Sequence, residues 1–221
     1  MARSSGPNDL QRAVKDAPGE TNARDRLLNA AIKVFSQYGF QGASLPKIGE
    51  TAGVSFQLVT YYFGSKENLW RAALETSFEE AARLARQPID PSQDYGTQLH
   101  AWLTTAFTLA LHHPYAQRII AQEAVADSER YTQHIKPMRR KFLKEFSYFF
   151  RQAHEQGLVP DLSTGEMMLI FRGIMFQLAL VPYDVEQMLG RRPDQPATIE
   201  QIVDLVVRLF LRGSGEKILE K

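Results

Sequence analysis

Cysteine is absent from the 221 residues of this chain, which excludes disulfides, thiolate metal sites and thiol nucleophiles together. No apolar run reaches the roughly 18 to 20 residues that span a bilayer, so we expect no membrane partner. The chain also lacks a large net charge, because 26 basic residues nearly balance 25 acidic ones. A small basic surface can still lie within such a neutral total.

The first 21 residues are polar, contain Pro and Gly, and have no apolar segment of the kind found in signal peptides. We therefore expect residues 1–21 to form a disordered tail and the protein to stay in the cytoplasm. Beyond the tail, apolar residues recur at helical spacing and the alternation that strands require is nearly absent. The sequence predicts an all-α fold, with helices over 22–38, 45–52, 55–63, 65–86, 93–112, 114–126, 129–156, 163–189 and 198–212.

Several residues mark the expected ends of these helices. Gly39 is a predicted stop for the first helix, with Phe40 folding back onto its last turn. Pro137 is expected at a kink or a helix start within 129–156. Capping-box patterns that begin at Ser163 and Thr198 predict where the last two helices start.

The segment between residues 44 and 63 predicts a helix-turn-helix. Each of its two helices is shorter than the about 12 residues needed for stability in water, so both must rest on the helix over 22–38. Gly53 permits a left-handed turn, Ser55 is an expected cap, and Gly49 lets the two helices approach closely. This spacing of a small residue, a turn glycine and a cap is typical of a helix-turn-helix.

The second short helix has a polar side suited to DNA. On a helical wheel, Gln57, Thr60 and Tyr61 lie opposite Val59, Tyr62 and Phe63. Glutamine can make a bidentate contact with adenine, hydroxyls can bind phosphates, and apolar side chains can touch thymine methyls. Helix N-termini and basic residues hold phosphates, and residues 24–71 carry a net charge of +3. The predicted DNA contacts are Ser44, Lys47, Ser55, Phe56, Gln57, Leu58, Thr60, Tyr61 and Lys66.

The stretches "YGF", "IGETAGVS" and "YYFGSKENL" within about residues 22–72 carry a family resemblance. This region resembles the N-terminal DNA-binding domain of the TetR/AcrR family of transcriptional regulators. The resemblance implies a DNA-binding domain over 22–68 and a larger ligand-binding and dimerisation domain over 69–221. One departure is that Thr60 stands where many relatives have a phosphate-contacting tyrosine, and Gln57 where a glycine is frequent. The phosphate contact could move to Tyr61.

The C-terminal helices predict a homodimer. "STGEMMLIFRGIMFQLALV" is apolar nearly all round, which indicates burial on every side, and the apolar segment "IEQIVDLVVRLFLR" follows it. We expect the last two long helices to meet their counterparts in a second subunit, with Leu205 and Phe210 facing the partner. Such a dimer would present two recognition helices to a pseudo-palindromic operator.

The resemblance also implies an effector site in the larger domain. Aromatic and methionine side chains at helical spacing belong to a plain core more often than to a ligand pocket. Arg172 leaves three alternatives open, namely a bond to an acid such as Glu123, an acidic ligand, or the dimer interface. The predicted effector contacts are Trp102, Phe107, Phe146, Phe149, Met168, Arg172, Met175 and Phe176.

No cofactor is expected, because the chain has no nucleotide-binding glycine loop, nucleophile elbow or metal-ligand spacing among its five histidines. The sequence thus predicts a repressor that a small, largely apolar molecule releases from double-stranded operator DNA. Two alternatives remain: a DNA-binding protein of the same fold without an inducer, serving an architectural or cell-division role, and a helical enzyme that uses the apolar cavity.

Overall fold

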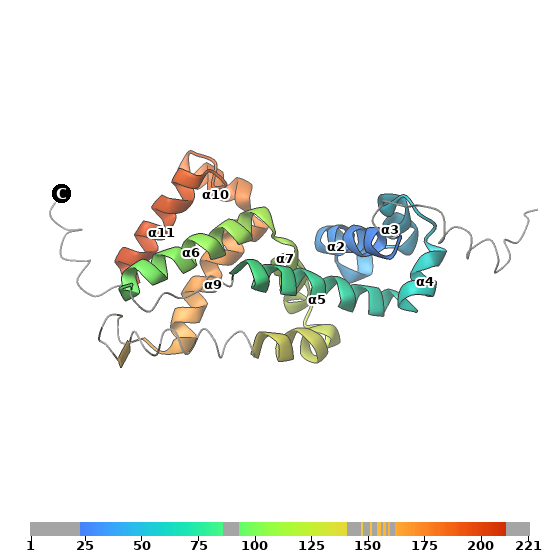
Figure 1. Ribbon diagram of the computed structural model, residues 1–221, viewed down its shortest axis with the longest axis horizontal. Helices are drawn as coiled ribbons and strands as arrows, with labels where there is room; N and C mark the ends of the chain where they lie inside the picture. The colour runs from blue at the N-terminus through green and yellow to red at the C-terminus, as the bar shows by residue number, and fades with distance from the viewer. Residues whose placement is uncertain are drawn as a thin grey trace, which may run out of the picture. The chain divides into compact units, whose positions relative to one another are not determined.

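The computed structural model describes residues 23–85, 93–140 and 162–210, together with positions 147, 151, 154, 155, 157 and 159 (Figure 1). Every regular element in this part of the chain is helical, which confirms the predicted all-α fold. The predicted tail over 1–21 lies outside the described residues. Contacts divide the chain into two compact units that meet between Phe78 and Glu79, within α5, and each is described by itself.

The N-terminal unit contains α2 (Ala23–Gly42), α3 (Leu45–Ala52), α4 (Gln57–Phe63) and the first part of α5 (Lys66–Ala85). α2 breaks at Gly39, where φ is 69° and ψ is 176°, and one further turn carries it to Gly42. Beyond this break Phe40 stacks on Phe35 with ring centroids 6.1 Å apart, as the sequence predicts. The fully buried side chains of this unit come from α2 to α5 and include Leu27, Phe35, Ile48, Val59, Leu69, Trp70 and Leu74.

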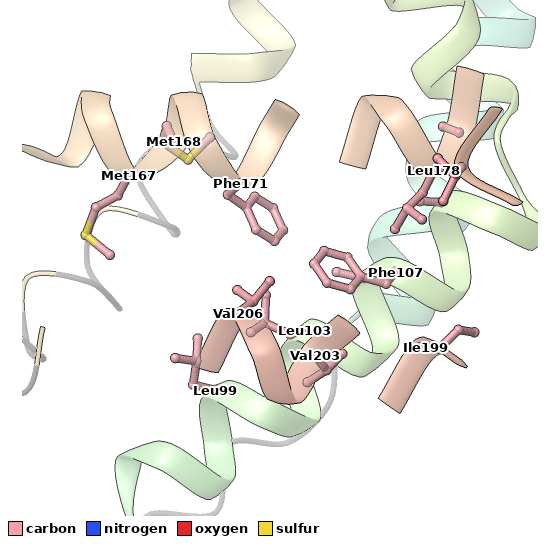
Figure 2. Packing of buried hydrophobic residues seen from close by; sticks show 14 of the residues in the cluster. Leu99, Leu103, Phe107, Met167, Met168, Phe171, Leu178, Ile199, Val203 and Val206 are labelled. Carbon is pink, nitrogen blue, oxygen red and sulfur yellow. The ribbon is translucent and has the colours of Figure 1, made fainter. Parts of the chain in front are cut away.

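The C-terminal unit contains α6 (Tyr95–His112), α7 (Tyr115–Val125), the π-helical segment η1 (Tyr131–Ile135), α9 (Thr164–Leu180), α10 (Pro182–Leu189) and α11 (Pro196–Phe210). α6 packs against both α9 and α11. Figure 2 shows Phe107 of α6 and Phe171 of α9 facing each other, with Val203 and Val206 of α11 nearby. This apolar cluster forms the core of the unit.

The prediction of one helix over 163–189 is wrong. Val181 leaves the helical conformation with φ −132° and ψ 50°, and α9 and α10 are bent by 102° at that point. Pro182 explains the break, because proline has no N–H to donate inside a helix and is well suited to the first turn of a new one. No single described helix is long and apolar enough to span a membrane; the bent pair α9 and α10 passes only by its combined length and composition.

The expected burial of α9 on every side is not found in a single chain, because Leu169 is 74% exposed and Ile170 is 43% exposed. The start of α9 is as predicted, since Ser163 and Glu166 form a complete capping box. The predicted cap at Thr198 is wrong, because α11 begins at Pro196 and Thr198 is buried within its first turn.

Pro137 follows a local distortion, as expected. The Lys136 N–H donates to the Tyr131 carbonyl, five residues back, which is the π-helical pattern. The rest of the helix predicted over 129–156 falls largely on residues that the structure does not describe beyond position 140.

Candidate functional site

The turn between α3 and α4 is fixed by two glycines. Gly53 has φ 65° and donates its N–H to the Glu50 carbonyl at 3.1 Å, while the Val54 N–H donates to the Gly49 carbonyl at 3.0 Å. These two bonds form a Schellman motif, which ends α3 and turns the chain toward α4. A Cβ added at Gly49 would lie 2.8 Å from the Phe56 nitrogen. The close approach predicted for Gly49 is therefore confirmed.

The start of α3 carries the predicted cap. The Ser44 Oγ accepts the Lys47 N–H at 3.3 Å, and Ser44 and Lys47 are both exposed. The Lys47 Nζ lies 3.3 Å from a Glu50 carboxylate oxygen. Because this ion pair is exposed on both sides, it contributes little to stability and leaves the lysine able to exchange partners.

α4 has one buried and one exposed side. Val59 and Phe63 are buried, whereas Gln57 and Thr60 are exposed and Tyr61 has 61% of its surface exposed. The division drawn on the helical wheel is therefore present in the fold. The sequence prediction that Leu58 faces DNA is not supported, because its side chain is 4% exposed and belongs to the core.

The residues before α4 differ slightly from the prediction. α4 begins at Gln57 with Phe56 at the cap position, not at Ser55. The Ser55 hydroxyl instead donates to the Gln57 Oε1 at 3.0 Å and lies 3.4 Å from the Gln57 nitrogen. Phe56 remains 43% exposed, so these side chains stand together at the exposed N-terminal end of α4.

Lys66 begins α5 and is half-buried. Its Nζ lies 4.5 Å from the centre of the Phe40 ring, a cation–π contact that holds the lysine stem against the unit. The Ser65 Oγ accepts the Asn68 N–H at 3.1 Å and thus caps α5. A positive charge and a helix N-terminus therefore coincide immediately after α4.

In the C-terminal unit, the predicted effector residues fall into two groups. Phe107 and Met168 are buried core residues, while Trp102 and Met175 are half-buried and pack against that core. Phe171 lies at the centre, with its ring 4.8 Å from Trp102 and 6.0 Å from Phe107. Phe146 and Phe149, also predicted to contact an effector, lie outside the described residues.

Arg172 follows Phe171 on α9 and is half-buried. Its guanidinium carbon lies 5.1 Å from the centre of the Phe176 ring. Burial lowers the pKa of Arg172, and the neighbouring charge of Arg139 lowers it further, while Tyr131 acts in the opposite direction. The alternative that Glu123 pairs with Arg172 is not supported, because the buried Glu123 carboxylate accepts bonds from Arg130, at 3.1 Å, and from Ser128.

Sequence reasoning missed three residues of this unit. Phe171 could have been found from its place three residues after Met168 on one apolar stripe. Tyr131 and Arg139 are eight residues apart, close to two helical turns, which is a weak signal at best. Among the described residues, no group of three or more His, Asp or Glu side chains could hold a metal ion.

Comparison with known proteins agrees with this geometry. The family model of bacterial regulatory proteins of the tetR family matches residues 27–73, which contain most of α2, all of α3 and α4, and the start of α5. The transcriptional repressor NicS of Pseudomonas putida is 36% identical over 104 residues, covering 45% of this chain and 47% of NicS. The chain thus spans about half the length of that relative.

Two further comparisons cover most of the chain. The transcriptional regulator RutR of Escherichia coli K12 is 24% identical over 213 residues, or 92% of this chain and 97% of RutR. The fold alone is shared with a TetR-like transcriptional regulator from Rhodococcus sp. RHA1, with a TM-score of 0.65 and 16% identity over 86% of this chain and 96% of the other. The region over residues 27–73 is therefore a DNA-binding domain of the TetR family of transcriptional regulators, and regulators of this family are not enzymes.

Proposed function

We propose that the protein is a homodimeric, ligand-responsive repressor that binds a pseudo-palindromic operator in the cytoplasm and leaves it when a small, largely apolar molecule binds. The observation that carries the DNA-binding part is the exposed side of α4, where Gln57, Thr60 and Tyr61 point away from a buried side. An amide, a hydroxyl and a phenol can read base edges and contact phosphates in a major groove. Leu58 is removed from the proposed contacts because it is buried.

Phosphate contacts are assigned to both ends of the helix-turn-helix. Ser44 and Lys47 stand at the exposed start of α3, and Lys66 stands at the start of α5. Helix N-termini attract anions, and each added lysine contributes a charge that releases counterions from DNA. We therefore expect the affinity for operator DNA to fall steeply with salt concentration.

The proposed dimer uses the face of the C-terminal unit that a single chain leaves apolar and exposed. On α11, Val203 and Val206 are buried, whereas Leu205 is 55% exposed and Leu209 is 62% exposed. α9 and α10 add further exposed apolar side chains, so the apolar surface extends beyond one helix. Exposed apolar side chains in this number support an interaction site, and a two-fold symmetric pairing of these helices fits the expectation from the family. The exposed large apolar side chains are Leu169, Ile170, Val181, Tyr183, Met188, Leu189, Leu205 and Leu209.

The proposed effector site lies among the aromatic side chains of α6 and α9. Trp102, Met175 and Phe176 are half-buried beside the central Phe171, so a bound molecule would contact apolar surface. An effector that lowers the affinity of the protein for operator DNA does so by favouring an arrangement of the two recognition helices that does not fit the operator. The effector must then bind more weakly to the operator-bound protein, by the same factor by which it lowers the operator affinity. A tenfold induction requires about 1.4 kcal/mol of differential affinity.

The experiment is fluorescence anisotropy of the full chain on DNA flanking its own gene, with a scrambled duplex as reference, at two salt concentrations. Tyr61→Ala should weaken binding to the flanking DNA, and Lys66→Ala should also reduce the salt slope by about 1. Tyr38→Ala and Lys33→Ala are the matched controls, because both side chains are exposed on α2 outside the proposed surface.

If Tyr61→Ala and Lys66→Ala both bind the flanking DNA with the affinity of the parent chain, the proposed DNA-binding surface is wrong. Sequence-selective binding that no small molecule releases would favour the alternative without an inducer. Equal, weak binding to both duplexes would favour an architectural role.

A further inference from the structure

The Phe40 ring is fixed between buried aromatic side chains of the N-terminal unit. At Gly39 the backbone has φ 69° and leaves the helical path, which turns Phe40 back onto α2. The ring stacks on Phe35 with an interplanar angle of 7° and meets Trp70 edge-on, with ring centroids 6.3 Å apart. Phe35 and Trp70 are both 0% exposed. The Phe40 ring therefore cannot turn without disturbing the core.

The same ring also contacts a lysine of α5. The Lys66 Nζ lies 4.5 Å from the centre of the Phe40 ring, inside the range of about 6 Å over which cation–π attraction acts. Lys66 and Trp70 are four residues apart on α5, so their side chains lie one turn apart on the same side of that helix. Both side chains reach Phe40, Trp70 from the core and Lys66 from the first turn. The ring thus fixes where the lysine ammonium lies.

A lysine held in this way is prepared for a phosphate. The flexible lysine stem loses conformational freedom when its ammonium is bound, and a contact present beforehand reduces that loss. The ammonium has several N–H donors, so attraction to a ring on one side is compatible with donation to a phosphate on another. Lys47 is held differently, because its Nζ lies 3.3 Å from a Glu50 carboxylate oxygen, with which a phosphate must compete. The Phe40 ring is neutral and positions Lys66 without adding a competing carboxylate.

We propose that Phe40 is a positioning residue for the phosphate contact of Lys66, and that its ring holds the ammonium at the start of α5 both before and after operator DNA binds. Phe40 itself does not touch DNA in this arrangement. The proposal rests on the proposed function, because it needs the contact between Lys66 and an operator phosphate. It gives the aromatic residue of the stretch "YGF" a role in DNA binding as well as in the core.

The first test is a double-mutant cycle on operator affinity, measured by anisotropy with the full chain. Phe40→Leu keeps an apolar side chain against the core but removes the aromatic face. A cation–π contact favours the positioned lysine by about two- to fivefold, so its loss should weaken operator binding by up to that factor. In the Lys66→Ala background Phe40→Leu should have no further effect, whereas in the Lys47→Ala background the full loss should remain. Phe40→Tyr, which keeps the ring, and Tyr38→Leu, which removes an exposed ring elsewhere on α2, should both bind like the parent chain.

Nuclear magnetic resonance of the chain with 13C-labelled lysine gives a readout that a purely structural role would not change. Protons over the face of an aromatic ring resonate upfield. The ε-methylene protons of Lys66, next to its Nζ, should therefore resonate upfield of those of Lys47 in the DNA-free protein, and Phe40→Leu should abolish the difference. The upfield shift should persist in the operator complex. Absence of the shift, or its loss when operator is added, would overturn the proposal.

The cycle also separates failure of this proposal from failure of the proposed function. Equal weakening by Phe40→Leu in every background would mean that the ring acts only through the stability of the unit, and would overturn the positioning role alone. If Lys66→Ala leaves operator affinity unchanged while Tyr61→Ala lowers it, the DNA-binding surface is retained and the positioning role is overturned. If neither substitution lowers the affinity, the proposed DNA-binding surface is wrong and the positioning role falls with it.

Discussion

Gly49 is the position where one added methyl group tests how α3 supports the recognition helix. The new Cβ of Gly49→Ala would lie 2.8 Å from the Phe56 nitrogen, 2.9 Å from the Val54 oxygen and 3.0 Å from the Phe56 Cα. Favourable contacts between carbon atoms lie at about 3.5 to 4.0 Å. All three neighbours are backbone atoms, so a change of side-chain rotamer cannot relieve the clash. The turn and the start of α4 must move instead.

The magnitude follows from two opposing effects. Overpacking a close-packed interior costs about 1 to 3 kcal/mol. Replacing glycine by alanine inside a helix recovers about 0.5 to 1 kcal/mol. The net loss in the free energy of unfolding is therefore roughly 0 to 2.5 kcal/mol, and the middle values of the two ranges leave about 1 kcal/mol. Since 1 kcal/mol corresponds to about 2 to 4 °C for a chain of 150 to 250 residues, we expect the Tm to fall by about 2 to 4 °C.

The assay combines thermal unfolding followed by circular dichroism with anisotropy on operator DNA. Gly49→Ala should lower both the Tm and the DNA affinity, because the clash displaces α4 relative to α3. Gly165→Ala is the control, since its added Cβ has no neighbour nearer than the Ser163 Oγ at 3.9 Å. A Gly49→Ala variant as stable as the parent chain and with unchanged DNA affinity would refute the reasoning.

Two further predictions concern a helix cap and the dimer. Ser44→Ala should lower the free energy of unfolding by about 0.5 to 2 kcal/mol in urea titrations, because the Lys47 N–H loses its acceptor, and Ser44→Asp should restore it. The cap is unimportant if the alanine and aspartate variants unfold alike. The double variant Leu205→Glu, Leu209→Glu should sediment as a monomer, because it places charges on the exposed apolar face of α11, whereas Gln201→Glu, at an exposed polar site, should remain dimeric. A double variant that stays dimeric would require another interface.

The helix-turn-helix was predictable because its signals are local. A left-handed glycine at Gly53, a side-chain cap at Ser44 and a close approach at Gly49 each act within a few residues of the chain. The missed break between α9 and α10 was local too, since Pro182 stands at the start of α10. The apolar pattern continues across that proline, and periodicity alone does not register the missing N–H.

The position of Leu58 shows where a helical wheel fails. α4 has only seven residues and contacts both α2 and α3, so its buried arc is wider than that of a helix with one neighbour. Leu58 therefore joins Val59 and Phe63 in the core, although it lies next to the exposed Gln57 on the chain. The width of that arc depends on the angles between helices, which the order of apolar residues does not specify.

The sequence by itself determined the helical class, most helix boundaries and the family, because hydrophobic periodicity, capping residues and turn glycines act over short stretches of chain. Only the tertiary structure decided that Glu123 pairs with Arg130 and that Phe171 joins Trp102 to Phe107. The contacts of Phe171 join residues on different helices. They depend on how the helices cross and how the loops turn, and local periodicity carries no record of either.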